Sequence, residues 1–193
     1  MTVEQLFEVL KIDKPSKILK EKEIELFKLI PELEKSKGFK QNNEWHIFDV
    51  YEHILHVVDN ISDDLILRLS ALFHDIGKPY VYTEDENGIG HFYGHFDKSE
   101  EIFKDFADRN KLEENIVKVV SKLIKYHDIR VSKLNTEQLL NIRNIFNDEE
   151  IERLYELRKA DLLAQNPKFH YILEDYEVEK KKILSIAERR KLR

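Results

Sequence analysis

The sequence predicts an all-α fold with a small β-hairpin or ordered-loop insert near residues 80–95. Three observations lead to this prediction. Apolar residues recur at helical spacing through most of the chain. The 193 residues include only 5 Gly and 4 Pro, and 36% are charged, which is typical of a compact, helix-rich soluble protein. One stretch, around Asn87-Gly88, carries instead the signal of a hairpin turn.

Composition limits the chemistry that the chain can perform. It has no Cys, which excludes disulfides, thiolate metal sites and Cys nucleophiles, so any metal has to be held by carboxylates and by the 8 His. The net charge of −6 argues against a broad nucleic-acid-binding surface, and no DNA partner is expected. No apolar run reaches membrane-spanning length and no signal peptide is recognisable, so we expect a cytoplasmic protein without a membrane partner.

The N-terminal region is predicted to be helical. Amphipathic patterns cover Val3 to Leu10 and Ile18 to Ile30, with Pro15-Ser16 between them and Pro31 interrupting the second. Residues 35–38 are predicted to form a loop. No domain break is evident here, and the length of the chain suits one domain with a sizeable core.

The next predicted helix runs from about Asp49 to Ile61. His53 borders its apolar stripe, whereas His56 is turned toward the polar side. His53 is therefore the better candidate for a metal ligand on this helix. The alternative is a core histidine that bonds to a backbone carbonyl.

The central stretch is Leu65 to Pro79, which begins as an apolar run all round a helical projection and so predicts a helix buried on every side. This helix ends in His74 and Asp75, two potential metal ligands side by side. An isolated buried Asp is costly, and pairing or metal coordination is the usual remedy. Gly77 allows close backbone approach and the proline is expected to stop the helix, so Lys78 should face the same opening. The alternative is a helix with an ordinary polar cap.

After this helix the pattern changes to that of a β-hairpin. Tyr80 to Thr83 and Ile89 to Tyr93 flank Asn87-Gly88, a strong signal for a two-residue turn. The segment then places His91 and His95 directly after the candidate ligands. A surface loop rich in aromatic and His residues is expected to fold over something. The alternative is a lid anchored by its aromatic side chains, with His91 merely hydrogen-bonded.

Further helices are predicted at residues 98–110, 113–126 and 149–165, and another at about residues 171–187, followed by a basic, solvated and frayed tail, Glu188 to Arg193. His127 ends a core-facing stripe, so its imidazole should point inward. Arg158 and Asp161 share one side of their helix and approach the edge of the core together. The alternative for these two residues is an ion pair that satisfies both.

The ordered set of these residues resembles the HD superfamily of metal-dependent phosphohydrolases, and more closely the HD domain at the C-terminus of bacterial tRNA nucleotidyltransferases, the CCA-adding enzymes. The similarity spans about Lys14 to Asn166. The matching segments are Lys14-Pro15-Ser16-Lys17-Ile18-Leu19, Ile30-Pro31-Glu32-Leu33, His46-Ile47-Phe48-Asp49-Val50-Tyr51-Glu52-His53, His74-Asp75-Ile76-Gly77-Lys78-Pro79, Gly90-His91-Phe92-Tyr93-Gly94-His95, Tyr126-His127-Asp128 and Arg158-Lys159-Ala160-Asp161-Leu162-Leu163-Ala164-Gln165. No Gly-Ser strand-turn with a paired Asp-x-Asp precedes this region, so the chain alone is not expected to add CCA.

The resemblance implies an HD-type helical bundle and a single domain over residues 1–193. Its parts would be an N-terminal helical extension at residues 1–40, an HD core at residues 41–166, and a C-terminal helix with a basic tail at residues 167–193. The resemblance also implies one or two divalent transition-metal ions, chosen from Mn, Ni, Co, Fe and Zn, because these metals suit imidazole and carboxylate ligands.

The family-like assignment gives each candidate a role. The first ion would be held by His53, His74, Asp75 and Asp161. If a second ion binds, Asp75 would bridge the two ions, and the shell of the second would be completed by His95 and His127. If only one ion binds, these last two imidazoles would become phosphate ligands or the acid for the leaving oxygen.

Asp75 and Lys78 are the residues assigned directly to catalysis. A metal held by neutral His and ionised Asp lowers the pKa of bound water enough to make hydroxide near neutral pH. Lys78 would neutralise charge that develops on phosphate, and Arg158 would clamp a nonbridging oxygen. His91 is a further candidate for substrate contact.

The first substrate class that the resemblance implies is the 2′,3′-cyclic phosphates and 2′-phosphates of nucleotides or RNA ends. One alternative is a nucleoside monophosphate phosphatase, and another is a noncatalytic RNA-binding or adaptor module. A pure binding module has no need of four inward imidazoles and two buried carboxylates, so an intact ligand set favours the enzyme. The sequence leaves the oligomeric state open.

Overall fold

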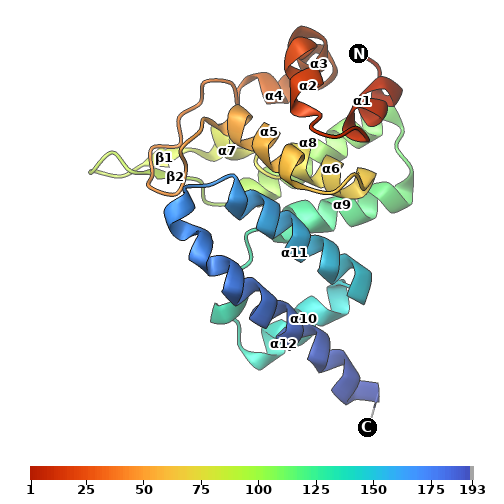
Figure 1. Cartoon of the computed structure of the whole chain (residues 1–193), viewed down its shortest axis with the longest axis vertical. Coiled ribbons are helices and arrows are strands. Elements are labelled where there is room, and N and C mark those ends of the chain that lie inside the picture. Colours follow the sequence, from red (N-terminus) through yellow and green to blue (C-terminus); the bar gives the residue numbers. More distant parts are fainter. Residues whose placement is uncertain (192–193) are drawn as a thin grey trace.

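Figure 1 shows a computed structural model of the chain, which describes residues 1–191, with side chains described as far as Ile186. Helices make up nearly all of the regular structure, and the described part of the chain has one sheet of two short strands. The prediction of an all-α fold with a small hairpin insert is therefore confirmed. The helices share one hydrophobic core, which extends from Leu6 near the N-terminus to Ile183 in the last helix.

The N-terminal region contains the short helices α1 (Val3–Leu10), α2 (Ser16–Glu21), α3 (Glu23–Leu29) and α4 (Pro31–Glu34). α1 has the predicted bounds, and the Thr2 side chain caps it by accepting a hydrogen bond from Gln5 N. The prediction of one helix from Ile18 to Ile30 is wrong, because the backbone leaves helical geometry at Lys22 (φ −106°, ψ 25°). Pro31 begins α4, since a proline is tolerated in the first turn of a helix.

α5 (Val50–Asn60) and α6 (Leu65–Phe73) are the central pair of helices. The side chains of Asp49 and Asp64 accept hydrogen bonds from backbone N–H groups of the first turns, which fixes where the two helices begin. Every residue from Leu67 to Phe73 is buried. The predicted central helix is therefore present, and its C-terminal end lies inside the protein.

The proline after α6 acts differently from the prediction. Pro79 does not stop a helix but lies in the first turn of the short helix α7 (Lys78–Val81). The chain turns between Phe73 and Lys78, so α6 ends before the proline, at the two candidate ligands. Pro79 therefore begins a new helix after the turn that carries His74 and Asp75.

The hairpin insert is present but shorter than predicted. Its strands are β1 (Thr83–Glu84) and β2 (Gly90–His91), paired antiparallel with Thr83 opposite His91. Tyr80 and Val81, which were predicted to be extended, are helical. The loop covers residues 85–89, so the prediction of a two-residue turn is wrong, and Gly88 within it takes a left-handed conformation (φ +75°).

The later helices are α8 (His95–Asn110), α9 (Glu114–Tyr126), α10 (Thr136–Ile145), α11 (Asp148–Leu163) and α12 (Leu173–Lys191), with the 3-10 turns η1 (Val131–Lys133) and η2 (Pro167–Ile172). α8 begins earlier than predicted, which puts His95 in its first turn. α10 has no counterpart in the prediction and is capped by Asn135. Of the predicted basic tail, residues 192 and 193 lie outside the described residues, and the backbone before them continues α12.

The position of α6 explains why distant residues meet. α6 packs against α5, α8, α9 and α11, and also against α1 (Figure 1). The helices α5, α8, α9 and α11 each carry one of the predicted ligands within them or directly at their end. Among the described residues, no helix combines the length and the apolar composition that crossing a membrane requires.

Candidate metal centre

Six predicted ligands converge at the C-terminal end of α6. They form two groups, and within each group one ligand atom per residue lies within 4.8 Å of all the others. The four-residue group consists of His53, His74, Asp75 and Asp161. The three-residue group consists of Asp75, His95 and His127. The structure therefore brings all six residues together, with Asp75 as the member that both groups share.

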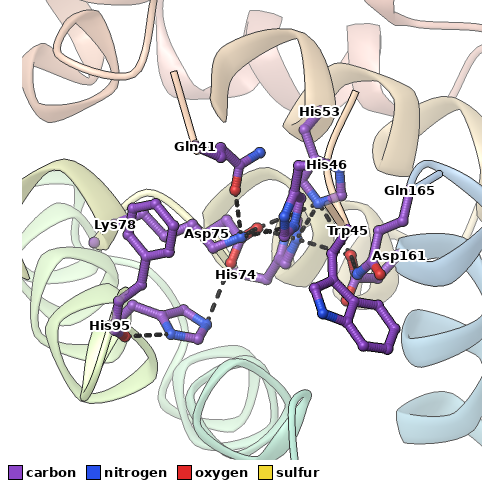
Figure 2. Close-up of polar contacts among 12 residues, drawn as sticks. Gln41, Trp45, His46, His53, His74, Asp75, Lys78, His95, Asp161 and Gln165 are labelled. Atoms are coloured by element: carbon purple, nitrogen blue, oxygen red, sulfur yellow. Dashed lines mark hydrogen bonds and ion pairs between the residues drawn. The ribbon is translucent and has the colours of Figure 1, made fainter. Parts of the chain in front are cut away.

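In the four-residue group, two imidazoles face carboxylate oxygens (Figure 2). His53 Nε2 lies 3.0 Å from Asp161 Oδ1 and 3.2 Å from Asp75 Oδ2. His74 Nε2 lies 3.2 Å from the same Asp75 oxygen and 3.3 Å from His53 Nε2. Asp161 is oriented by Gln165, whose amide nitrogen donates a hydrogen bond to its Oδ1 (3.0 Å) from one turn further along α11.

The three-residue group uses the other oxygen of Asp75. His95 Nε2 lies 3.3 Å from Asp75 Oδ1, and His127 Nε2 lies 3.7 Å from it. The two Nε2 atoms are 3.3 Å apart. Asp75 Oδ1 is buried and accepts no hydrogen bond from the described part of the chain. Asp75 thus turns one oxygen to each group, which is the arrangement of a carboxylate that bridges two cations.

The backbone fixes three of the imidazoles in the same way. Each Nδ1–H donates to the carbonyl oxygen three positions earlier, from His74 to Ala71 (2.8 Å), from His95 to Phe92 (2.9 Å) and from His127 to Ile124 (2.7 Å). A neutral imidazole held in this way presents a lone pair at Nε2. These lone pairs face carboxylate oxygens and one another, which is repulsive unless a proton or a metal cation lies between them. The donor set and its orientation therefore fit a divalent metal.

Burial and charge set the protonation of these groups. Burial lowers the pKa of His95 to about 3, so this imidazole is neutral near pH 7. Burial alone would lower the pKa of His53. The hydrogen bonds of His53 to Asp161 and Asp75 outweigh this effect and raise its pKa to about 9. Burial likewise acts against the charged form of His127, yet the nearby carboxylate of Asp75 raises the pKa of that imidazole. A metal entering the four-residue group must therefore displace a proton from His53.

Lys78 is buried beside Asp75, which agrees with the prediction that it lies on the same side as the His-Asp pair. Its Nζ is 2.6 Å from Asp75 Oδ2, the oxygen that faces the four-residue group. Burial disfavours the charged form of Asp75, but the charges of His74 and Lys78 hold its pKa well below the usual range. The predicted contact between Lys78 and a phosphate group stays a prediction.

Gly77 allows α8 to approach the ligand turn. A Cβ atom at this position would lie 2.5 Å from the carbonyl oxygen of His95 and 2.7 Å from the backbone nitrogen of Ser99. Gly77 N also donates a hydrogen bond to Ser99 Oγ (2.9 Å). His95 reaches Asp75 because only glycine leaves room for this backbone contact.

His91 and Arg158 lie outside both groups. His91 is in β2, where its Nε2 is 3.2 Å from Asp85 Oδ2 and its ring stacks on Tyr93. This placement matches the alternative in which His91 is only hydrogen-bonded. The predicted contact of His91 with substrate stays a prediction. Arg158 donates a hydrogen bond to Glu179 of α12 (3.1 Å), so the alternative of an ion pair between Arg158 and Asp161 is wrong.

His56 lies where the helix register predicted it. It is exposed, whereas His53, three positions earlier on α5, is buried, and the ring of His56 stacks on Phe48 with 4.2 Å between centroids. The distinction between the two histidines of α5 is therefore confirmed as a matter of placement.

Sequence reasoning did not single out three polar residues at the site. Gln41 and His46 contact Lys78, and Gln165 contacts Asp161. His46 and Gln165 lie within segments that carry the family resemblance, and Gln165 follows Asp161 at helical spacing, so the sequence could have identified both as site residues. Nothing in the sequence indicated Gln41, because it lies in a loop 37 residues from its partner Lys78.

A cleft of about 770 Å³ lies beside the two groups. It is bordered by the loop after α9, the end of α11 and one face of α12. It shares two residues with the ligand cluster, His127 and Asp161, and it is also lined by His46. Its aromatic lining residues are Trp45, Tyr171 and Tyr176, and its cationic ones are Arg130, Arg158 and Lys182. A volume of this size suits a small organic ligand such as a nucleotide.

The helical fold and the shared aspartate define a helical protein with a candidate site for a divalent metal. The HD domain family model matches residues 45–165, and the chain belongs to this family. HD domains form a family of metal-dependent phosphohydrolases that bind divalent metals, and the His and Asp groups described above are compatible with such a site.

The chain is also similar to a protein of known activity. The A-adding tRNA nucleotidyltransferase of Deinococcus radiodurans is 32% identical to it over 108 residues. The match covers 53% of this chain and 25% of the relative, so the chain spans about a quarter of the length of that curated protein. The similarity therefore concerns one region of the relative, and its whole activity does not transfer with it.

Proposed function

We propose that the chain hydrolyses phosphate esters of nucleotides or RNA ends, with 2′,3′-cyclic phosphates and 2′-phosphates as its first substrates. One observation carries the proposal: Asp75 turns its two oxygens to two histidine groups at the wall of a cleft of nucleotide size. The relative is named for an activity on tRNA, which favours an RNA-related substrate.

The four-residue group would hold the first divalent ion, with Mn, Ni, Co, Fe and Zn as the metals that suit its ligands. When bound, the metal supplies a hydroxide nucleophile near neutral pH and polarises the phosphate. The three-residue group would hold a second ion through Asp75 Oδ1. If it holds none, His127 is the better proton donor for the leaving oxygen, because its pKa is raised whereas that of His95 is lowered.

The cleft would hold the nucleoside part of the substrate. Trp45 and Tyr171 line it with 36% and 70% of their surface exposed, so both rings can stack on a base. Trp45 is held in place by stacking on Phe169, with 3.7 Å between ring centroids. Base stacking on an aromatic side chain contributes about 1–3 kcal/mol and tolerates any base.

The charges of the cleft favour a single nucleotide or a chain end over a long nucleic acid. Its three cationic residues are accompanied by acidic ones, which include Asp128, Asp175 and Glu179. A groove for a long phosphate backbone is usually dominated by Lys and Arg. The mixed lining suits a nucleoside with one reacting phosphate.

The test is a hydrolysis panel on the purified protein, loaded in turn with each of the five metals. The substrates are nucleoside 2′,3′-cyclic monophosphates, 2′-monophosphates, 5′-monophosphates and a short oligoribonucleotide with a 2′,3′-cyclic phosphate end. We expect turnover of the cyclic and 2′-phosphates, and none in an Asp75→Asn control prepared in parallel.

Two outcomes would replace the proposal. Turnover restricted to 5′-monophosphates would identify a nucleoside monophosphate phosphatase. RNA binding without turnover under any metal would identify a noncatalytic module, and would leave the shared aspartate without a chemical role.

A further inference from the structure

Three protein acceptors surround the ammonium group of Lys78. Its Nζ is 2.6 Å from Asp75 Oδ2, 2.8 Å from Gln41 Oε1 and 3.2 Å from His46 Nε2, as Figure 2 shows for the labelled side chains. An ammonium group has three N–H donors. The side chain is buried, with 5% of the residue exposed. Every donor of Lys78 therefore has a partner within the protein.

Gln41 and His46 are themselves oriented to accept from Lys78. His46 Nδ1 lies 2.9 Å from Asn43 Oδ1, so Nδ1–H donates there and Nε2 carries the lone pair that faces Lys78. The Gln41 amide nitrogen donates to the carbonyl of Phe48 (3.4 Å), which turns its Oε1 toward Lys78. The acceptors are arranged by their own partners before any substrate arrives.

The hairpin holds the loop that carries these acceptors. Gly90 N of β2 donates a hydrogen bond to the carbonyl oxygen of Asn42 (3.0 Å), and the Asn42 amide donates to the Tyr82 hydroxyl (3.0 Å). A Cβ atom at Gly90 would collide with the backbone oxygen of Gln41. The loop and the hairpin therefore pack by direct backbone contact, which limits how far the acceptors of Lys78 can move.

We propose that Lys78 is a positioning residue that acts through Asp75, and that Gln41 and His46 keep it there. The proposal rests on the proposed function in that Asp75 is taken to bind metal. Lys78 would direct Asp75 Oδ2 toward the four-residue group and act as a fixed positive charge beside the metal. A substrate phosphate would then take its charge neutralisation from the metal rather than from Lys78.

The competing assignment, in which Lys78 binds the substrate phosphate, requires at least one of its three hydrogen bonds to break. That would leave a buried acceptor on Asp75, Gln41 or His46 without its donor, which is costly. The fixed position of Lys78 also has a consequence for metal affinity. A fixed ammonium next to a ligand oxygen opposes the binding of a divalent cation, so its removal should strengthen metal binding.

The first experiment compares Mn²⁺ affinity, measured by calorimetry with a competing chelator and without substrate, in Lys78→Met and in wild type. We expect the variant to bind Mn²⁺ at least about tenfold more tightly, because a buried positive charge near the ion is removed. The control is Lys104→Met, which changes an exposed lysine of α8 that pairs with Glu100 and should leave the affinity unchanged. Equal or weaker binding in Lys78→Met would overturn the proposal.

A second experiment uses the wild-type protein, so it does not depend on how the variant folds. A crystal structure with Mn²⁺ and inorganic phosphate should retain the contacts of Lys78 Nζ with Gln41 Oε1 and His46 Nε2. A phosphate oxygen within hydrogen-bonding distance of Nζ, with either contact broken, would overturn the proposal. In that case hydrolysis of nucleotides would stand and the positioning role would fall, whereas a wild-type protein that binds no Mn²⁺ would contradict the proposed function itself.

Discussion

The two ligand groups share Asp75 but differ in charge and in protonation. The four-residue group has a second carboxylate, from Asp161, and a histidine whose pKa is raised to about 9. The three-residue group has one carboxylate oxygen, from Asp75, and contains His95, whose pKa is lowered to about 3. Because a carboxylate adds negative charge to a divalent-metal site, the comparison predicts that the four-residue group binds a metal more tightly than the three-residue group, with Asp75 serving both.

The largest effect should come from the residue that the groups share. Asp75→Asn keeps the shape of the side chain but removes the charge from both groups at once. We expect metal affinity to fall by at least about 100-fold, because loss of a residue that only hydrogen-bonds to a ligand already costs about 10- to 100-fold. Phosphoester hydrolysis should disappear. The metal content after dialysis measures the first effect, and the hydrolysis rate measures the second. A variant that keeps its metal would show that Asp75 is not the shared ligand.

Removal of the Asp161 carboxylate should weaken metal binding in the four-residue group only. In Asp161→Asn the four-residue group loses its second carboxylate, while the three-residue group is untouched. We expect the tight class of Mn²⁺ binding to disappear from a titration curve, leaving binding as weak as that of the three-residue group. Unchanged tight binding would place the stronger site elsewhere.

The converse change is His95→Gln, which alters only the three-residue group. We expect tight Mn²⁺ binding to persist. Turnover should fall by roughly two powers of ten, the usual effect of losing a side chain that assists proton transfer. The titration and the rate are measured on one preparation. Loss of tight binding in this variant would mean that the two groups act as one site.

The two groups should also differ in how their metal affinity depends on pH. Below pH 9 the raised pKa keeps His53 protonated, and a metal must displace that proton before it binds. The affinity of the tight class should therefore increase by about tenfold per pH unit between pH 6.5 and 8.5 and approach a plateau near pH 9. Calorimetry in buffers of different ionisation enthalpy counts the released protons, and a pH-independent affinity would contradict the pKa of His53.

Helical periodicity located several members of the ligand cluster, while the complete set, which includes His95 from the segment predicted as a loop, came from the family resemblance. His53 and His127 border apolar stripes, and His74 with Asp75 ends a helix that is buried on every side. Once those stripes face a common core, the side chains beside them are brought together. The same reasoning placed His56 on the outside, where the structure has it.

What the sequence could not supply depends on loops and on contacts between distant segments. Gln41 and Lys78 meet through the packing of a loop on a hairpin, and no periodic pattern records this contact. Arg158 was placed correctly at the edge of the core, but its partner Glu179 lies on α12, and the path of that helix depends on the turn at η2. Periodicity thus predicts which face is buried but not which partner a charged residue finds.

The smallest expected effect distinguishes the two histidines of α5. His56 is exposed and touches the ring of Phe48, whereas His53 is buried among carboxylates. His56→Ala should leave metal affinity and turnover unchanged and should alter the free energy of unfolding by less than about 1 kcal/mol, the scale of one exposed ring contact. His53→Ala, measured beside it, should lose the tight class of metal binding, because it removes an imidazole that contacts both Asp75 and Asp161. Equal losses in the two variants would contradict the register of α5, and with it the placement of the four-residue group on which the comparison depends.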